Sequence, residues 1–257
     1  MKLQGQVSIL TGSAAGIGRA CALEFAREGA PVVVADINLA GAQVTVKQIE
    51  GAGGVAVAIH TDVADPGSVE NLVDQTIHAF GRINVLFNNA AIQVNKTVEE
   101  TTVEEWNRQI AVNLGGVFLC SKFSLPHLRE TKGCIVNMAS VNGFFVETMC
   151  AGYCATKGGI IALTKAMAID HGKDGIRVNC ICPGYIDAGL AWGYFEAQRD
   201  PSEARHAAGK LHALGRIGRP EEVARLAVFL ASADASFMTG SSLVVSGGFG
   251  TGLPPAD

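Results

Sequence analysis

The chain has 257 residues, of which 48% are hydrophobic and 17% are charged, so it has enough apolar residues for a full globular core. Its net charge of −4 gives no reason to expect nucleic acid or an anionic membrane as a partner. No apolar run reaches about 18 residues, and the first residues resemble a strand rather than a signal peptide. We therefore expect a cytoplasmic protein without a membrane segment.

The cysteines point to the same compartment. There are seven of them, an odd number, and most lie inside apolar runs, which is typical of reduced and buried thiols. Cys180 and Cys182 lack further ligands at metal-binding spacing, and the six histidines are scattered. We expect no metal site.

The first element is a short apolar strand over residues 7–11, followed by a glycine-rich turn from Gly12 through Gly16 to Gly18 and a helix to Arg27. Glycines allow a backbone to turn sharply and to approach a pyrophosphate, whose charge is stabilised at a helix N-terminus. A second strand, residues 31–36, ends in Asp36, eighteen residues after Gly18. This spacing predicts a dinucleotide site in which Asp36 holds the adenosine ribose.

Asp36 also indicates which cofactor is bound. A carboxylate at this position repels a 2′-phosphate, and Ile37 offers no cation to receive one. We therefore expect NAD rather than NADP.

Two further strands follow, over residues 55–60 and 83–87, with a helix over residues 66–80 between them. Asp62 accepts the adenine amino group or caps this helix region; the sequence leaves both possibilities open. The small residues and amides at 88–91 suit a backbone that passes close to a ribose. The alternation of strands and helices predicts an α/β fold with a parallel sheet.

A long helix is expected over residues 103–129, with Asn113 in its middle. Asparagine is a weak helix former because its side chain competes for backbone hydrogen bonds. It either distorts the helix and holds a water molecule, or is a core amide bonded to a neighbouring carbonyl.

The stretch from Ser140 to Lys157 contains the chemistry. Ser140 follows a buried strand over residues 134–139, and Tyr153 and Lys157 are four residues apart on a helix over residues 151–171, so they share one face. The cation favours the phenolate of Tyr153, but lowering the pKa of the phenol by about three units also requires a second positive group, which a bound cationic nicotinamide ring would supply. These residues predict proton transfer to and from an alcohol, with Ser140 holding the substrate oxygen.

The last third of the chain contains a strand over residues 176–181, a turn at Pro183 and Gly184, a helix that starts near Pro220 and a strand over residues 242–245. Residues 187–214 interrupt the alternation, and a segment of this length between a strand and a helix is typical of a substrate loop or lid.

In their order along the chain, these motifs resemble the short-chain dehydrogenase/reductase (SDR) family over essentially the whole sequence. The resemblance rests on residues 11–18, residues 88–90, Asn113, Ser140, Tyr153 with Lys157, and residues 183–184. It implies a single Rossmann-like domain over residues 1–257, with a doubly wound parallel sheet of about seven strands and helices on both faces. It also implies a homotetramer.

The resemblance implies roles for individual residues. Tyr153 would be the general acid/base, and Lys157 would lower its pKa and bind the nicotinamide ribose. Ser140 would orient the substrate, and Asn113 would anchor the water of a proton relay. The cofactor-binding set would be Gly12, Ala15, Gly16, Ile17, Gly18, Asp36, Ile37, Asp62, Val63, Asn89, Ala90, Tyr153, Lys157, Pro183, Gly184 and Ile186.

Three positions depart from the family pattern. Ala91 replaces a glycine, a change of one methyl group that we expect to be tolerated. Ala188 replaces a threonine that holds the nicotinamide carboxamide, so we expect another group, such as Asp187, to take over. Ser246 replaces an aspartate, and nothing in the sequence indicates what compensates.

The predicted activity is NAD-dependent interconversion of a secondary alcohol and a ketone, on a small molecule such as a cyclic alcohol, hydroxysteroid or sugar. Candidate substrate-binding residues are Ser140, Asn142, Phe145, Tyr153, Tyr185 and Trp192. Two alternatives share the fold. One is an NADPH-dependent 3-oxoacyl-carrier-protein reductase, and the other is a non-catalytic NAD-binding regulatory protein.

Overall fold

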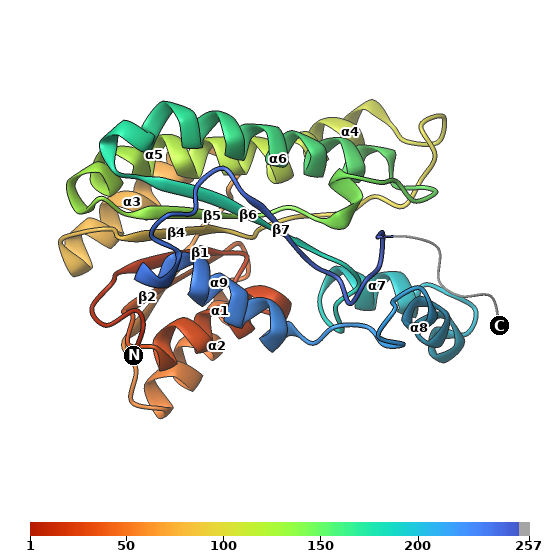
Figure 1. The fold of residues 1–257 in the computed structure, drawn as a ribbon, viewed down its shortest axis with the longest axis horizontal. Coiled ribbons are helices and arrows are strands. Elements are labelled where there is room, and N and C mark those ends of the chain that lie inside the picture. The colour runs from red at the N-terminus through yellow and green to blue at the C-terminus, as the bar shows by residue number, and fades with distance from the viewer. Residues whose placement is uncertain (252–257) are drawn as a thin grey trace.

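The computed structural model describes residues 1–251, which fold around one parallel sheet (Figure 1). Its seven strands are β1 (Ser8–Thr11), β2 (Val32–Asp36), β3 (Ala56–His60), β4 (Val85–Asn88), β5 (Cys134–Met138), β6 (Arg177–Pro183) and β7 (Ser242–Val245). They lie in the order β3-β2-β1-β4-β5-β6-β7, and every neighbouring pair is parallel. This confirms the predicted α/β, Rossmann-like sheet.

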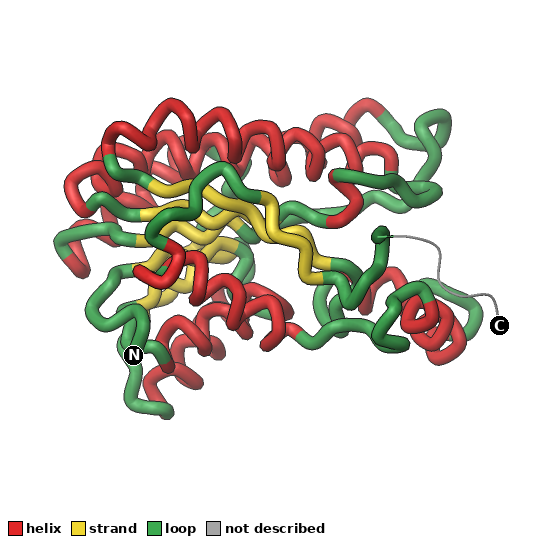
Figure 2. The backbone as a smooth tube through the Cα atoms, viewed as in Figure 1, coloured by secondary structure: helices red, strands yellow, loops and turns green. Residues whose placement is uncertain are grey.

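Helices cover both faces of the sheet (Figures 1 and 2). The α-helices are α1 (Gly16–Arg27), α2 (Leu39–Gly51), α3 (Pro66–Phe80), α4 (Val103–Ile110), α5 (Gly116–Thr131), α6 (Ala151–His171), α7 (Leu190–Glu196), α8 (Pro201–Lys210) and α9 (Pro220–Ala231). Helices α1, α2 and α9 lie on one face, and α3, α5 and α6 lie on the other. The central strands are buried on both faces, which explains why they consist of continuous apolar runs.

Local sequence signals determine where several helices begin and end. Asp65 caps α3 by accepting hydrogen bonds from the backbone amides of Gly67 and Ser68, Pro66 occupies its first turn, and Gly81 ends it in the left-handed conformation. These signals explain why the predicted range of α3 is confirmed to the residue.

The order of the strands determines where a ligand-binding crevice can form. The chain runs from β1 outward to β3 and then returns to β4 beside β1, so the loops after β1 and β4 leave the sheet on opposite sides. A crevice opens at such a reversal, beyond the carboxyl ends of the strands.

Two segments differ from the expectation. The predicted helix over residues 103–129 is divided into α4 and α5 by a π-helical turn, Ala111–Gly115, which contains Asn113. Residues 187–214, expected as a substrate loop or lid, contain two short helices, α7 and α8, at one end of the molecule (Figure 1).

None of the helices within residues 1–251 is sufficiently long and apolar to cross a bilayer. All seven cysteines are buried free thiols, as expected. Pro254 and Pro255, noted in the sequence as closing the chain, lie outside the described residues.

Candidate active site

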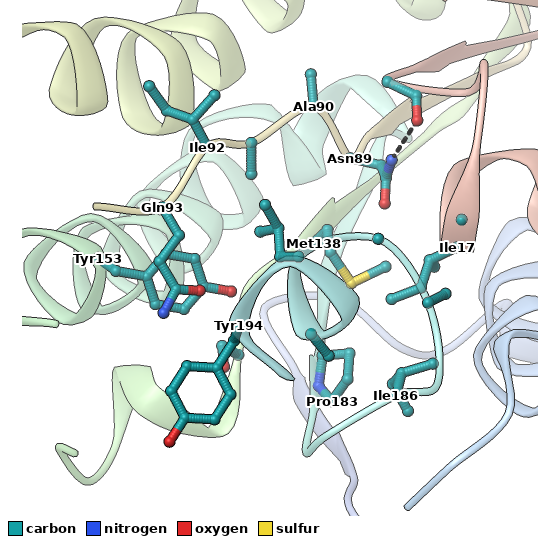
Figure 3. A pocket seen from close by; sticks show the side chains of 18 of the residues that line it. Ile17, Asn89, Ala90, Ile92, Gln93, Met138, Tyr153, Pro183, Ile186 and Tyr194 are labelled. Atoms are coloured by element: carbon teal, nitrogen blue, oxygen red, sulfur yellow. Dashed lines mark hydrogen bonds between the residues drawn. The ribbon is translucent and has the colours of Figure 1, made fainter. Parts of the chain in front are cut away.

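A cavity of about 750 Å³ lies at the carboxyl ends of the strands. Every residue of the predicted cofactor set lines it, from Gly12 to Ile186, and so do Ser140, Asn142 and Tyr185. Figure 3 shows Ile17, Ile186, Pro183, Met138 and Tyr153 around this space. Residues far apart in the sequence are therefore brought to one cavity.

The glycine turn between β1 and α1 forms one end of the cavity. Gly12 and Gly16 have φ angles of 63° and 55°, a conformation that favours glycine. A Cβ on Gly18 would lie 2.1 Å from the carbonyl oxygen of Gly12, so only glycine permits the close packing of α1 on β1. Ala15, the N-cap, provides no side-chain acceptor for the free amides of the first turn of α1. Such amides bind anions, and the turn therefore fits a pyrophosphate.

Asn89 holds this turn from the neighbouring strand. Its side-chain amide donates hydrogen bonds to the carbonyl oxygens of Thr11, at 3.1 Å, and Gly12, at 2.9 Å, and Figure 3 draws one of these bonds as a dashed line. The amide therefore joins the turn after β1 to the loop after β4, on either side of the reversal in strand order.

Asp36 lies at the end of β2, and its carboxylate is held by two backbone amides. Oδ2 accepts from Ala14 N and Oδ1 accepts from Asn38 N, both at 2.9 Å. Ile37 follows with an exposed side chain. The nearby guanidinium of Arg19 is bonded to Ala14 O and Thr45 Oγ1, and Arg19 does not line the cavity.

Asp62 does not cap α3, because Asp65 does so. Its Oδ1 accepts from Ala64 N at 2.9 Å, and its Oδ2 forms an ion pair with Arg108 at 3.2 Å. Both Asp62 and Arg108 line the cavity, as does Val63.

Ser140, Tyr153 and Lys157 come together where β5 ends and α6 begins. Lys157 is 2% exposed, its Nζ donates to Met138 O at 2.7 Å, and it lies 5.3 Å from the centre of the Tyr153 ring. Ser140 is buried, and its hydroxyl accepts from Asn142 N at 3.2 Å. The trio predicted from the sequence is therefore assembled in one cavity.

Burial dominates the electrostatics of the trio. Burial raises the pKa of Tyr153, and a hydrogen bond with Ser140 only partly opposes this effect. Burial also lowers the pKa of Lys157, to about 8. In the protein by itself, desolvation of the phenol therefore outweighs the effects that favour the phenolate, and the second positive charge expected from a bound nicotinamide ring is still required.

Asn113 is a fully buried amide bonded to its neighbours. Its Oδ1 accepts from Ile92 N at 2.8 Å, and its Nδ2 donates to Ile92 O at 2.9 Å and to Thr156 Oγ1 at 3.2 Å. The side chain thereby joins the loop after β4 to α6. The asparagine also lies in the π-helical turn, so both sequence interpretations, a distorted helix and a bonded core amide, apply.

The predicted substrate residues divide into two groups. Asn142 and Tyr185 line the cavity together with Ser140 and Tyr153. Phe145 and Trp192 do not, which is a correction to their expected placement: Phe145 packs edge-on against Phe249, and the half-exposed indole of Trp192 donates to Asp187 Oδ1 at 2.8 Å.

Three lining residues were not expected from the sequence. They are Gln93 in the loop after β4, Gln198 after α7, and Phe249 after β7. Glu147, a further candidate pocket residue in the sequence, also lines the cavity. Phe249 follows the paired glycines after the last strand, which is the one local signal that the chain turns back toward the site.

The structure bears on two of the three departures from the family pattern. Asp187 does not replace the threonine missing at Ala188, because its carboxylate faces Trp192 and Arg205 and does not line the cavity. The hydroxyl of Ser246 donates to Phe249 O at 2.9 Å, so it holds the turn that carries Phe249.

Comparison with known proteins agrees with this site. The model of a family described as "Enoyl-(Acyl carrier protein) reductase" matches residues 12–250. The chain is 43% identical over 250 residues to meso-2,3-butanediol dehydrogenase of Serratia marcescens, covering 96% of both chains. It is 41% identical over 251 residues to cyclohexanol dehydrogenase of Acinetobacter sp. (strain SE19), again covering 96% of both. The ligand-free structure of Thermoplasma acidophilum aldohexose dehydrogenase (AldT) is similar with a TM-score of 0.89 and 34% identity, covering 99% of this chain and 98% of that one. The protein belongs to the short-chain dehydrogenase/reductase family.

Proposed function

We propose that this protein is an NAD-dependent oxidoreductase that interconverts a secondary alcohol and a ketone. The family acts on alcohols and ketones with NAD or NADP. The observation that carries the proposal is the presence of Ser140, Tyr153 and Lys157 in the same cavity as the glycine turn and Asp36.

Tyr153, Ser140 and Lys157 have separate roles in the proposed reaction. Tyr153 takes the hydroxyl proton of the alcohol during oxidation and returns it during reduction, while Ser140 holds the substrate oxygen and stabilises its developing charge. The nicotinamide cofactor, when bound, accepts or supplies the hydride. Lys157 uses one of its three N–H bonds on Met138 O, which leaves two for a ribose hydroxyl or for water.

The burial of Lys157 and Tyr153 supports a role for Lys157 that depends on the cofactor. With the cofactor bound, Lys157 makes Tyr153 an effective base. Both groups are buried, so a further positive charge in the cavity acts through a medium of low polarity, where it has a large effect. Asn113 is a positioning residue, because it ties the loop after β4 to α6.

Asp36 supports NAD over NADP. Its carboxylate is fixed by two amides at the cavity wall, where a 2′-phosphate would meet a like charge. NAD in turn favours oxidation of the alcohol in a cell.

A second candidate is a 3-oxoacyl-carrier-protein reductase, which the acyl-carrier-protein description of the matching family model favours. Asp36 argues against it, as does the absence of lysine or arginine from residues 13–15. A non-catalytic NAD-binding regulatory protein is disfavoured, because Asn113, Ser140, Tyr153 and Lys157 are all present at the site.

The names of the relatives support a cyclic alcohol, a hydroxysteroid or a sugar as substrate, since they include a cyclohexanol dehydrogenase, a 3beta-hydroxysteroid dehydrogenase and an aldohexose dehydrogenase. The test is a panel of secondary alcohols and sugars with NAD or NADP, followed by the absorbance of the reduced cofactor. We expect turnover of at least one alcohol with NAD and much slower turnover with NADP. Reduction of a 3-oxoacyl thioester with NADPH, and no alcohol oxidation, would favour the second candidate.

A homotetramer in the cytoplasm is also part of the proposal. Apolar side chains are exposed on α5, on α6 and near the edge strand β7, namely Phe118, Ile169, Phe237 and Val244. Light scattering should give four times the chain mass of 26.7 kDa.

A further inference from the structure

Among the described residues, the side chains of three acidic residues line the cavity. Asp36 ends β2 and Asp62 follows β3, where the adenosine is proposed to bind. Glu147 differs from them, because it lies in the segment between Ser140 and Tyr153. No function proposed so far uses it.

Glu147 is held in place from both sides. Its Oε1 accepts from Tyr185 OH and its Oε2 accepts from Asn142 Nδ2, each at 2.9 Å. The thiol of Cys150 donates to its backbone carbonyl oxygen at 3.1 Å, which secures the turn that carries it. A carboxylate accepts about four hydrogen bonds, so each oxygen retains acceptor capacity on the cavity side. Within residues 1–251, no lysine or arginine forms an ion pair with it.

Asn142 links the carboxylate to Ser140, because its side chain donates to Glu147 Oε2 and its backbone amide donates to Ser140 Oγ. Burial is the main cause of the raised pKa of Tyr153, and the charge of Glu147 adds to it. Burial and Glu147 also raise the pKa of Tyr185. Glu147 therefore lies on the wall of the same cavity as Ser140 and Tyr153, where a bound molecule can reach it.

The remaining wall of this part of the cavity is aromatic. Tyr185, Tyr194 and Phe249 line it, with ring centres 6.2 Å apart for Tyr185 and Tyr194 and 5.6 Å apart for Tyr185 and Phe249. Figure 3 shows Tyr194 at the same opening as Tyr153 and Gln93. Such a wall suits the C–H surface of a carbon skeleton, while the carboxylate requires a hydrogen-bond donor and repels anions.

We propose that Glu147 binds a second hydroxyl group of the substrate, so that the substrate class is a diol or polyol rather than a simple alcohol. This inference rests on the proposed function. In the reaction, the carbinol C–H bond breaks and its electron pair leaves as hydride to NAD⁺, while the proton of the same hydroxyl passes to Tyr153. The second hydroxyl keeps its proton and donates a hydrogen bond to Glu147, and the product is a hydroxyketone.

The test compares cyclohexanol with the isomers of 1,2- and 1,3-cyclohexanediol as substrates, with NAD, in the parent and in Glu147→Gln. The glutamine keeps the size of the side chain and partners for Asn142 and Tyr185, but it replaces a charged acceptor with a neutral one. We expect kcat/KM for the best diol to fall about tenfold, mainly through KM, because hydrogen bonds to charged groups are the stronger ones. The loss for cyclohexanol should be several times smaller. Glu196→Gln, which removes an exposed carboxylate from α7, should leave both substrates unchanged.

The ratio of the two losses decides the matter, since it isolates the contact between one side chain and one hydroxyl. Equal losses for diol and cyclohexanol, or no loss for the diol, would overturn the inference while leaving the proposed function intact. If 2-aminocyclohexanol is oxidised faster than every diol and loses more in Glu147→Gln, the group bound is an ammonium and the assignment of a hydroxyl is wrong. If the parent oxidises none of these alcohols, the proposed function itself fails, and the inference fails with it.

Discussion

Lys157 shows how much a single buried residue can contribute to the chemistry of this site. It is a cation at 2% exposure with one hydrogen bond to a backbone carbonyl, and burial lowers its pKa to about 8. Near neutral pH the lysine is therefore close to losing its proton in the protein alone. A ribose hydroxyl or a water molecule that accepts from its free N–H bonds would favour the charged form.

Replacing Lys157 with methionine should change the dependence of stability on pH. The folded lysine releases its proton near pH 8, while the unfolded lysine holds it to about pH 10.5, so the unfolded state binds more protons in this window. The free energy of unfolding of the cofactor-free parent should therefore rise relative to Lys157→Met by up to about 1.4 kcal/mol per pH unit from pH 8 to 10. Urea denaturation of both proteins at several pH values checks this, and parallel curves would show that the lysine is not desolvated.

Asp36 allows a second prediction at this scale. Asp36→Asn preserves the shape of the side chain and removes the charge that faces the proposed ribose. The preference for NAD over NADP, measured as the ratio of kcat/KM values, should fall by about tenfold or more, because the repulsion of a 2′-phosphate is relieved. An unchanged ratio in a variant with the parental melting temperature would show that Asp36 does not select the cofactor.

At the scale of elements, α1 packs closely against the turn that follows β1. Gly18→Ala would place a methyl group 2.1 Å from the carbonyl oxygen of Gly12, so the turn must open. We expect weaker NAD binding by at least about tenfold and a lower melting temperature. Gly51→Ala at the end of α2 is the matched control, because a Cβ there meets nothing within 4 Å and alanine favours a helix. If the two variants behave alike, the packing of Gly18 is not what shapes the turn.

Several elements could be predicted from the sequence because their signals are local. Helices α3 and α6 have the expected ranges, and the glycine turn and Asp36 are spaced as a dinucleotide site requires. The π-helical turn could not be predicted, since it accompanies hydrogen bonds between Asn113 and Ile92 that form only in the folded protein. Helices α7 and α8 are short and lack a clear apolar period.

The substrate end of the cavity was the least predictable part for the same reason. Glu147 and Tyr185 are separated by 38 residues in sequence and are joined by one hydrogen bond. Phe249, which also lines the cavity, lies near the C-terminal end of the chain. Side chains that meet only through the tertiary structure leave no spacing pattern. Trp192 and Phe145, which are aromatic and near the site in sequence, were misplaced because proximity along the chain does not tell which way a side chain points.

For the molecule as a whole, the buried thiols predict sensitivity to alkali. Burial raises the pKa of Cys120 to about 12 and that of Cys134 to about 11, and that of Cys21 even further. Unfolded thiols ionise near pH 8.5, so the folded state holds more protons above that pH and its stability should fall as the pH rises further. Urea denaturation at pH 8, 9 and 10 measures this fall, and Cys120→Ala should reduce its slope by about one proton. A slope unaffected by that substitution would contradict the assignment.

The central claim is that one phenol moves the proton while the same cavity holds the dinucleotide. The most direct measurement is the turnover of Tyr153→Phe with the best alcohol and NAD, together with its affinity for NADH by fluorescence titration. The variant should lose at least about 10²-fold to 10⁴-fold in kcat while binding NADH nearly as tightly as the parent, because it lacks only the ionisable oxygen. Turnover at the parental rate would contradict the account.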